Sequence, residues 1–390
     1  MSGPSDKNIP RGQRFLFIVL LLLLISAALI GLVSYPFVFV LLLWLGALIY
    51  AAWNATTANK KAVCINLAAV AGLLLALEAH WVNKKEFRKR PVVATNQVTG
   101  FSMKDPLLGY TRAPNYSRDA TKTVNGQASY SVTYTTDSSG YRITPQPENP
   151  LDDTCMIFLG CSFTFGDGVN DAEAMPYQVA ELSNRKTINL GVSGYGPHHM
   201  LAAIEFDLLP DLGDCSGKIA VYQAIEDHVS RAAGLGHVGE IGPRYVISET
   251  GQVVYAGQYG DRLKSNDAGA IWGAVFGKSY IYQEYFVERY WVGEDEIELY
   301  LAIVAAAKSR LQQKFPGVHF IVLYWDTSDR SHAREIEARL PEIADEYIRV
   351  SEIIPGIDAD PTSWLLPLDP HPNAKAHRAI AEHLTQRTTQ

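Results

Sequence analysis

The chain has 390 residues, 47% of them hydrophobic, and a formal net charge of −7. That length and apolar content suffice for at least one large core. The charge is unevenly divided, because residues 1–90 carry +7 and the remainder of the chain therefore carries −14. A soluble part this acidic repels phosphate backbones, so we expect no nucleic-acid partner.

Three apolar runs open the chain. Residues 15–33 contain no charge and are long enough to cross a bilayer as a helix, and residues 37–53 form a second such run. The third run, residues 62–81, carries Glu78 and His80, so it is either a third span or a buried or interfacial helix. A signal peptide is disfavoured because the first run leads directly into the second. We expect a multi-pass membrane protein with two to three transmembrane helices before residue 91.

Neither the basic residues nor the cysteines fix the compartment of the soluble part. With three spans, five Lys and Arg residues fall on each side of the membrane, which leaves the orientation undecided. The four cysteines, Cys64, Cys155, Cys161 and Cys215, show no metal-ligand spacing. Cys155 and Cys161 stand at either end of one predicted strand, where they cannot bridge each other.

After the membrane region, residues 91–150 predict a small β-rich lead-in, with an alternating strand over 129–135. From residue 151 onward, apolar strands and amphipathic helices alternate. The predicted strands cover residues 154–160, 186–190, 218–225, 318–325 and 347–350, and the predicted helices cover 175–184, 197–209, 295–315, 333–340 and 373–387. This order predicts an α/β fold in which helices cover both faces of a parallel sheet.

An insertion over residues 229–294 interrupts that alternation. It contains a predicted hairpin, 245–248 with 252–256, followed by an aromatic-rich stretch. Its aromatic residues either line an acyl or sugar pocket or, as the favoured alternative, pack a small core of the insertion itself. They are Trp272, Phe276, Tyr280, Tyr282, Tyr285, Phe286, Tyr290 and Trp291.

Ser162 is the leading candidate for a nucleophile. It follows the first strand in a glycine-rich turn, at the edge where open α/β sheets place their sites. The alternative is an ordinary strand-to-helix connection with a solvated serine. A serine needs a base, and a neutral imidazole held by a carboxylate provides one. Asp369 and His371 lie two residues apart in a proline-stiffened loop, whereas His377, the rival base, falls on the terminal helix and is expected to be structural.

Four segments, in this order, resemble the blocks of the SGNH (GDSL-like) hydrolase superfamily. They are FLGCSFTFG around Ser162, NLGVSGYG around Gly194, YQAIEDHVSR at the end of the third strand, and LDPHPN near the carboxyl terminus. The resemblance covers roughly residues 150–387 and implies a flavodoxin-like three-layer sandwich. It also implies that Ser162 is the nucleophile, that the N–H groups of Ser162 and Gly194 form the oxyanion hole, and that Asp369 and His371 complete the site.

This chain departs from the family pattern at three places. Cys161 stands where the first block usually has aspartate. The last block is one residue shorter than usual, with Leu368 at the usual position of the acid. The third block normally supplies an asparagine that donates to the oxyanion, but here Glu226 stands at that position, followed by Asp227 and His228. Because a carboxylate cannot donate a hydrogen bond, we expect His228 or Gln223 to take over that role.

We therefore expect a serine esterase of SGNH type that cleaves an acyl ester on a cell-envelope glycan or lipid through an acyl-enzyme, with no cofactor and no metal. One alternative is an O-acyltransferase that uses the same residues on a polysaccharide. Another is a catalytically weakened glycan-binding or assembly protein, for which Glu226 is the main support. The expected partners are the acylated glycan or lipid, the membrane and envelope polysaccharide machinery. Because such substrates lie outside the cytoplasm, we expect the catalytic domain to be extracytoplasmic.

Overall fold

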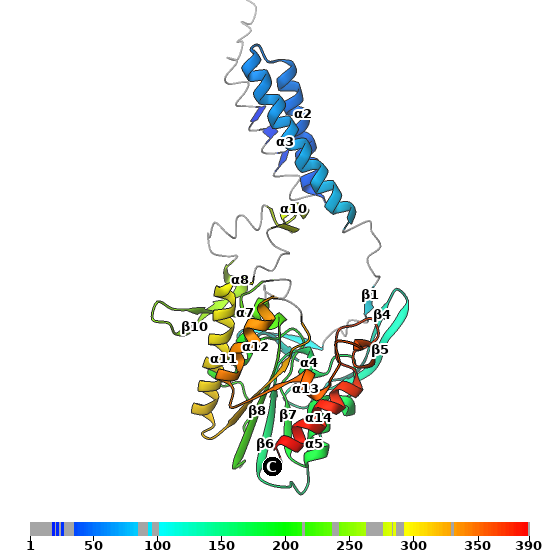
Figure 1. The fold of residues 1–390 in the computed structure, drawn as a ribbon, viewed down its shortest axis with the longest axis vertical. Coiled ribbons are helices and arrows are strands. Elements are labelled where there is room, and N and C mark those ends of the chain that lie inside the picture. Colours follow the sequence, from blue (N-terminus) through cyan, green and yellow to red (C-terminus); the bar gives the residue numbers. More distant parts are fainter. Residues whose placement is uncertain are drawn as a thin grey trace, which may run out of the picture. The chain divides into compact units, whose positions relative to one another are not determined.

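The computed structural model describes residues 18–19, 21–22, 25–26, 35–84, 93–95, 101–212, 215–235, 242–262, 276–282, 284–285, 292–328 and 331–388. The chain divides into two compact units (Figure 1). The smaller unit combines Met1–Arg90 with Ser265–Arg289, and the larger unit combines Pro91–Lys264 with Tyr290–Gln390.

The larger unit is built on a five-stranded parallel sheet with the strand order β12-β11-β8-β6-β7. Counted along the chain, this is the order 2-1-3-4-5 of flavodoxin-like folds, which confirms the predicted α/β architecture. The order reverses between β6 and β8, and such a switch point is where open α/β sheets place their sites. The strands are β6 (Thr154–Leu159), β7 (Lys186–Asn189), β8 (Gly217–Ile225), β11 (His319–Trp325) and β12 (Glu346–Arg349).

Helices cover both faces of this sheet (Figure 1). From β6, Ile157 and Leu159 enter one apolar core, whereas Met156 and Phe158 enter the core on the opposite face. A strand buried on both sides needs no polar residues, which is why this stretch is continuously apolar. The first core is closed by α6 (Pro197–Glu205), α7 (Asp227–Ala232), α11 (Glu294–Lys314) and α12 (Ser331–Ile343), and the second by α5 (Met175–Ser183), α13 (Val350–Ile353) and α14 (Ala374–Thr388).

Most predicted helices of the larger unit match the observed ones closely, but α6 is shorter than expected. It ends at Glu205 instead of residue 209. The backbone of Asp207 adopts a φ of +59°, in the left-handed region that a continuing helix cannot use.

The lead-in consists of antiparallel strands. The strands β1 (Val93–Thr95), β4 (Ser117–Val124) and β5 (Gln127–Thr135) form one sheet, while β2 (Ser102–Asp105) and β3 (Gly109–Arg112) form a separate hairpin. Their apolar side chains do not stand apart from the α/β part, because Phe101, Val132 and Tyr134 pack around Phe165, which lies just after Ser162. The lead-in and the turn that carries the candidate nucleophile therefore share one small core.

A disulfide joins Cys155 on β6 to Cys215, with 5.7 Å between their Cα atoms. Cys215 precedes β8, and Thr154 pairs with Gly217 in the sheet, so the parallel pairing of β6 and β8 brings the two cysteines together. This pairing was not predicted from the sequence. Cys161 and Cys64 are free thiols.

In the smaller unit, α2 (Pro36–Trp53) and α3 (Ala58–Val82) are both long and apolar enough to cross a membrane. Of the first predicted span, only residues 18–19, 21–22 and 25–26 are described, and the rest lies outside the described part of the chain. Ser26 in this segment accepts a hydrogen bond of 3.1 Å from the indole N–H of Trp44 on α2.

The carboxylate of Glu78 on α3 is buried and fully engaged. It accepts hydrogen bonds from Ser279 Oγ (3.0 Å), Tyr280 N (2.8 Å) and Ile281 N (2.9 Å), at the start of the short helix α10 (Tyr280–Tyr282). An acidic residue in an apolar helix is therefore matched by donors from the distant insertion.

The described aromatic residues of the insertion contact one another and also aromatic residues near the N-terminus, which the sequence analysis did not anticipate. Phe276 packs against Tyr282 within the insertion, with 6.0 Å between the ring centroids. Three rings of the insertion also contact aromatic residues of the N-terminal segment. The pairs are Phe276 with Phe37 (5.7 Å), Tyr280 with Tyr35 (6.3 Å) and Tyr285 with Trp81 (6.0 Å). Trp272, Phe286, Tyr290 and Trp291 lie outside the described residues.

The part of the insertion that belongs to the larger unit forms the predicted hairpin. Strands β9 (Pro243–Ile247) and β10 (Val253–Gln258) pair antiparallel and are followed by the one-turn helix α8 (Tyr259–Arg262).

Candidate active site

Ser162 begins α4 (Ser162–Phe165), a single helical turn that follows β6 after Gly160 and Cys161. The turn ends at Gly166, whose φ of +87° is readily available only to glycine. Ser162 is 5% exposed, so it is nearly buried at the carboxyl end of the sheet. A second close approach occurs at Gly191, where a Cβ atom would collide with the backbone of Thr164.

The structure brings Ser162, His371 and Asp369 into one hydrogen-bonded relay. His371 Nε2 lies 2.8 Å from Ser162 Oγ, and His371 Nδ1 lies 2.5 Å from Asp369 Oδ1. The same Asp369 oxygen also accepts the backbone N–H of His371 at 2.9 Å, which fixes the aspartate within its own loop. A serine, an imidazole and a carboxylate in this order can generate a nucleophile.

The loop that carries Asp369 is strained at the preceding residue. Leu368 has a φ of +59°, an unfavourable conformation for a branched side chain, and that side chain points into solvent with 56% exposure. Leu368 occupies the place where the SGNH pattern has its acid. The left-handed turn at this residue precedes a buried Asp369 carboxylate, which is 1% exposed.

Asp369 has a further partner that the sequence did not reveal. Its second oxygen, Oδ2, lies 2.5 Å from the ammonium of Lys122 on β4. Burial opposes ionisation of this carboxyl, but the hydrogen bonds and charges of His371 and Lys122 outweigh it and hold the pKa of Asp369 well below its usual range. No local pattern marks Lys122, because the contact spans 247 residues.

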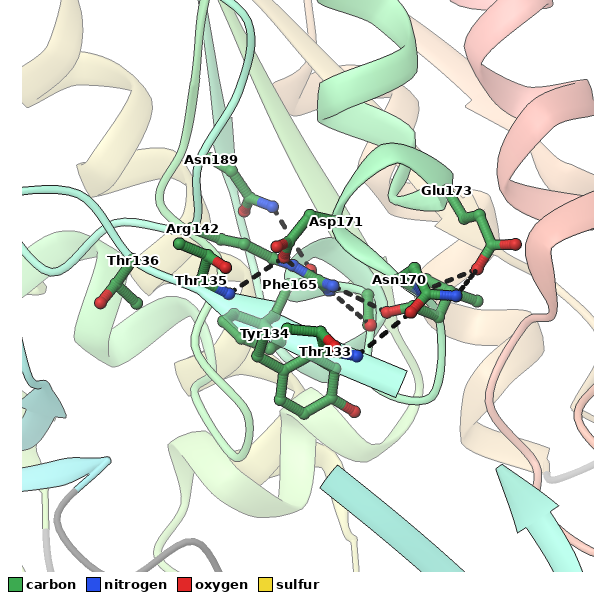
Figure 2. Close-up of polar contacts among 12 residues, drawn as sticks. Thr133, Tyr134, Thr135, Thr136, Arg142, Phe165, Asn170, Asp171, Glu173 and Asn189 are labelled. Carbon is green, nitrogen blue, oxygen red and sulfur yellow. Dashed lines mark hydrogen bonds and ion pairs between the residues drawn. The ribbon is translucent and has the colours of Figure 1, made fainter. Parts of the chain in front are cut away.

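The loop after Ser162 is held by the buried guanidinium of Arg142, which comes from the end of the lead-in (Figure 2). Its Nη1 donates to the carbonyl oxygens of Phe165 and Gly166 at 2.6 Å each, and its Nη2 donates to that of Val169 at 2.7 Å. Its Nε donates to Asp171 Oδ1 at 3.0 Å. The four accepting groups fix one loop in one geometry, since a planar guanidinium donates in fixed directions.

Strand β5 is attached to the same loop. The backbone N–H groups of Thr133 and Thr135 donate to Asn170 Oδ1 and Asp171 Oδ1, both at 3.1 Å (Figure 2). The hydroxyl of Tyr134 accepts the N–H of Gly168 at 2.7 Å. The loop after the candidate nucleophile is thus hydrogen-bonded along one edge of the lead-in.

The second block braces the nucleophile turn from the other side. Asn189, at the end of β7, donates to the carbonyl oxygen of Thr164 at 3.1 Å. Ser193 Oγ donates to Asp167 Oδ1 at 2.8 Å, which ties the second block to the first immediately before Gly194. Gly194 itself has a φ of +88°, so the backbone reverses at the residue expected to supply an oxyanion N–H.

At the third block, Glu226 is engaged by groups that the sequence analysis did not single out. Its Oε1 lies 2.7 Å from His332 Nε2, and its Oε2 accepts a hydrogen bond of 2.9 Å from Ser328 Oγ. The neighbouring Asp227 begins α7 and lies 3.9 Å from Arg231. The carboxylate of Glu226 thus contacts His332 and Ser328, and that of Asp227 faces Arg231.

The two proposed substitute donors occupy different surroundings. Gln223 Oε1 accepts a hydrogen bond of 2.9 Å from Thr164 Oγ1, so this amide touches the turn that begins with Ser162. His228 is fully buried, and its Nδ1 lies 2.8 Å from the hydroxyl of Tyr222. Burial first, and then the positive charge of Arg231, lower the pKa of His228 well below its usual value. The structure brings Gln223 to the nucleophile turn and places His228 against Tyr222.

The remaining histidines have structural surroundings. His377 Nδ1 accepts the N–H of Met175 at 3.1 Å, and burial lowers the pKa of His377 to about 3. His199 Nδ1 accepts the N–H of Gly196 at the start of α6. Burial also lowers the pKa of His198 to about 3. Within the described ranges, no three His, Cys, Asp or Glu side chains are arranged to hold a metal ion.

A hollow of about 510 Å³ lies close to the relay. Trp325, Asp326, Ser328 and Leu365 are among the residues that line it. The ring of Phe163 connects it with the relay, since its centroid lies 5.1 Å from that of Trp325 and 5.2 Å from that of His371. The ring of Phe163 thus lies between His371 and a residue that lines a hollow with room for a substrate group.

No protein-family model matches the chain, and no curated protein matches it. It is similar to a G-D-S-L-family protein from Desulfitobacterium hafniense DCB-2, with 11% identity, 60% of this chain and 98% of that chain covered, and a TM-score of 0.36. A GDSL-like protein from Parabacteroides merdae ATCC 43184 shows 14% identity, 62% and 99% coverage, and a TM-score of 0.34. An acetyl xylan esterase from the rumen bacterium Butyrivibrio proteoclasticus shows 11% identity, 61% and 64% coverage, and a TM-score of 0.33. Likenesses this distant bear on neither reaction nor substrate.

Replacing Arg142 by Met should expose the nucleophile turn. The substitution leaves three buried carbonyl oxygens and Asp171 without their partner, and losing one side of a buried charged network costs about 3–5 kcal/mol. Cys161 is a free thiol with no exposed surface, so its labelling by a maleimide reports opening of this region. We expect labelling at least about 100-fold faster in Arg142→Met, measured by mass spectrometry.

The matched control is Arg378→Met, which breaks an exposed pair with Glu382 on α14. That change should cost less than about 1 kcal/mol and leave the labelling of Cys161 nearly unchanged. Equal labelling rates in the two variants would show that Arg142 does not hold the turn.

Proposed function

We propose that this protein is a serine hydrolase of SGNH type that cleaves an acyl ester. The observation that carries the proposal is the relay in which His371 lies 2.8 Å from Ser162 Oγ and 2.5 Å from Asp369. An isolated solvated serine would need neither a buried carboxylate nor an imidazole oriented by it. The relay therefore favours catalysis over a binding protein that has merely kept the fold.

In the proposed reaction, Ser162 Oγ attacks the ester carbonyl carbon while His371 Nε2 takes the hydroxyl proton. The tetrahedral intermediate collapses when His371 returns that proton to the departing alcohol, which leaves the acyl group on Ser162. A water then attacks the acyl-enzyme carbonyl carbon and gives a proton to His371. His371 returns this proton to Ser162 Oγ as the bond from Ser162 to the acyl group breaks, which releases the acid and restores the serine hydroxyl. Asp369 orients the imidazole and stabilises its protonated form throughout.

The oxyanion of that intermediate needs hydrogen-bond donors. We assign two of them to the N–H groups of Ser162 and Gly194, at the two backbone turns that meet beside the nucleophile. For the third we favour Gln223 over His228, because Gln223 contacts Thr164 in the nucleophile turn whereas His228 is enclosed with Tyr222. Glu226 takes no part in this assignment, since His332 and Ser328 occupy its oxygens.

For the substrate we propose an acyl ester on a glycan or lipid of the cell envelope, with the larger unit on the extracytoplasmic side. Two helices long enough to span a membrane support a location at a membrane, and the disulfide between Cys155 and Cys215 favours an oxidising compartment. Protein taken from its own membrane under thiol-blocking conditions should yield the linked peptide of these two cysteines. Recovery of both as free thiols would count against an extracytoplasmic site.

The direct test compares p-nitrophenyl acetate hydrolysis by the full-length protein in detergent micelles with that by Ser162→Ala. We expect the variant to lose at least about 10³-fold in kcat, because the nucleophile is gone. Product analysis in the presence of a glycan acceptor separates free acid from acyl transfer, which would use the same residues. Equal turnover by both proteins would refute the proposed role of Ser162.

The same assay separates the two candidate oxyanion donors. Gln223→Ala should lower kcat by about 10²-fold with KM little changed, since the lost donor acts mainly in the transition state. His228→Phe keeps a buried ring and should leave kcat within about threefold. A loss confined to the His228 variant would reverse this assignment.

A further inference from the structure

One basic side chain of the lead-in, Lys122, contacts the Ser162–His371–Asp369 relay. Lys122 lies on β4, and its ammonium contacts Asp369 Oδ2 at 2.5 Å. The contact coincides with an irregularity in the β4–β5 pairing, because Lys122 pairs with Tyr130 whereas Thr123 pairs with Ala128. A bulge of this kind redirects side chains and often lies beside a functional site. The strand geometry thus aims the lysine at the aspartate.

The two oxygens of Asp369 have separate partners. Oδ1 accepts both the ring N–H and the backbone N–H of His371, while Oδ2 is occupied by Lys122. The aspartate side chain is 1% exposed and that of Lys122 is 22% exposed. When His371 is protonated, the Asp369 carboxylate interacts with two cations, His371 and Lys122. Each cation reduces the electrostatic attraction between the aspartate and the other cation.

We propose that Lys122 is a positioning residue of the hydrolase site, which holds Asp369 in place and, by compensating its charge, sets the pH range in which His371 can act as a base. The proposal rests on the proposed function for its catalytic meaning. It also makes the lead-in a part of the active site.

Other charged and titratable groups face the relay from each element around it. Tyr130 lies on β5, and burial together with the negative charges of Asp167 and Asp369 raises its pKa to about 12, so it stays neutral at working pH. Asp167 follows α4 and is hydrogen-bonded to Ser193. His377 on α14 is kept neutral by burial, which lowers its pKa to about 3. Among these neighbours, Lys122 is the cation in direct contact with Asp369.

Removing the lysine charge should shift the pH dependence in a defined direction. Without Lys122, the charge of Asp369 acts undivided on His371 and favours its protonated form. The carboxylate also becomes easier to protonate, and a protonated Asp369 no longer supports the base. Both effects reduce the fraction of protein with a neutral His371 and an ionised Asp369 as pH falls. The acid side of the profile of activity against pH should therefore move to higher pH by about 0.5 to 1 unit.

The experiment uses the full-length protein in detergent micelles and follows two reactions against pH. Carbethoxylation of His371 by diethyl pyrocarbonate, read by mass spectrometry, reports the state of the imidazole without any turnover. Labelling of Ser162 by a fluorophosphonate reports the nucleophile. The variants are Lys122→Met, Lys122→Gln, which retains a donor but no charge, and Lys122→Arg, which retains the charge. Lys104→Met, at an exposed site on β2, is the matched control.

We expect the midpoint for His371 to rise by about 0.5 to 1 pH unit in the Met and Gln variants, and to stay within about 0.2 unit in the Arg and Lys104 variants. One unit below the original midpoint, this amounts to a rate about 3- to 10-fold lower. If Lys122→Met does not fold, Lys122→Gln decides the question.

Unchanged midpoints in the Met and Gln variants would overturn the proposal, even if the maximal rates fell. If the midpoints are unchanged but the fluorophosphonate labels Ser162 in the wild type, the proposed hydrolase function is unaffected. Shifted midpoints without fluorophosphonate labelling of the wild type would instead refute the hydrolase while supporting the lysine as the group that tunes His371.

Discussion

The guanidinium of Arg142 is the contact on which the arrangement of the site depends. Four carbonyl or carboxylate groups of one short loop converge on it, namely the carbonyl oxygens of Phe165, Gly166 and Val169 and the carboxylate of Asp171. The loop begins at the candidate nucleophile and ends where β5 is attached. Because one buried cation fixes both, the position of Ser162 and the position of the lead-in are set together.

That coupling explains how a lysine from a distant strand reaches the relay. Strand β5 is hydrogen-bonded to the loop around Asn170 and Asp171, and β4 is paired with β5. The bulge beside Lys122 then directs its side chain to Asp369. The strands before the α/β fold are therefore a structural support of the site, and a loss of the Arg142 contacts would displace both the nucleophile and the lysine.

The sequence was sufficient for features that are encoded locally. Continuous apolar strands and their spacing predicted the parallel sheet, and Asp369 and His371 were identifiable because they share a short stiff loop at the end of the fold. The glycine-rich turn after a buried strand made Ser162 a candidate, and the Asp369–His371 loop elsewhere in the chain made it the leading one. Each of these signals lies within about ten residues, where backbone preferences and side-chain chemistry can be combined directly.

Features that depend on tertiary contacts were not accessible in this way. The pairing of Cys155 with Cys215 follows from strand order, and the Lys122 contact follows from a bulge, neither of which has a residue pattern of its own. From the sequence, Glu78 counted against a membrane-spanning helix, because its hydrogen-bond donors come from the distant insertion and could not be predicted. The contacts of the insertion's aromatic residues with Tyr35, Phe37 and Trp81 were missed for the same reason, since these partners lie more than 190 residues earlier in the chain.

In the proposed function, the relay with His371 and Asp369 activates Ser162 as a nucleophile. The most direct measurement is tandem mass spectrometry of the full-length protein after reaction with a fluorophosphonate at neutral pH. We expect a single phosphonyl adduct on Ser162, which is absent when His371 is replaced by Ala. An unmodified Ser162 in the wild type, or an adduct that persists without His371, would contradict it.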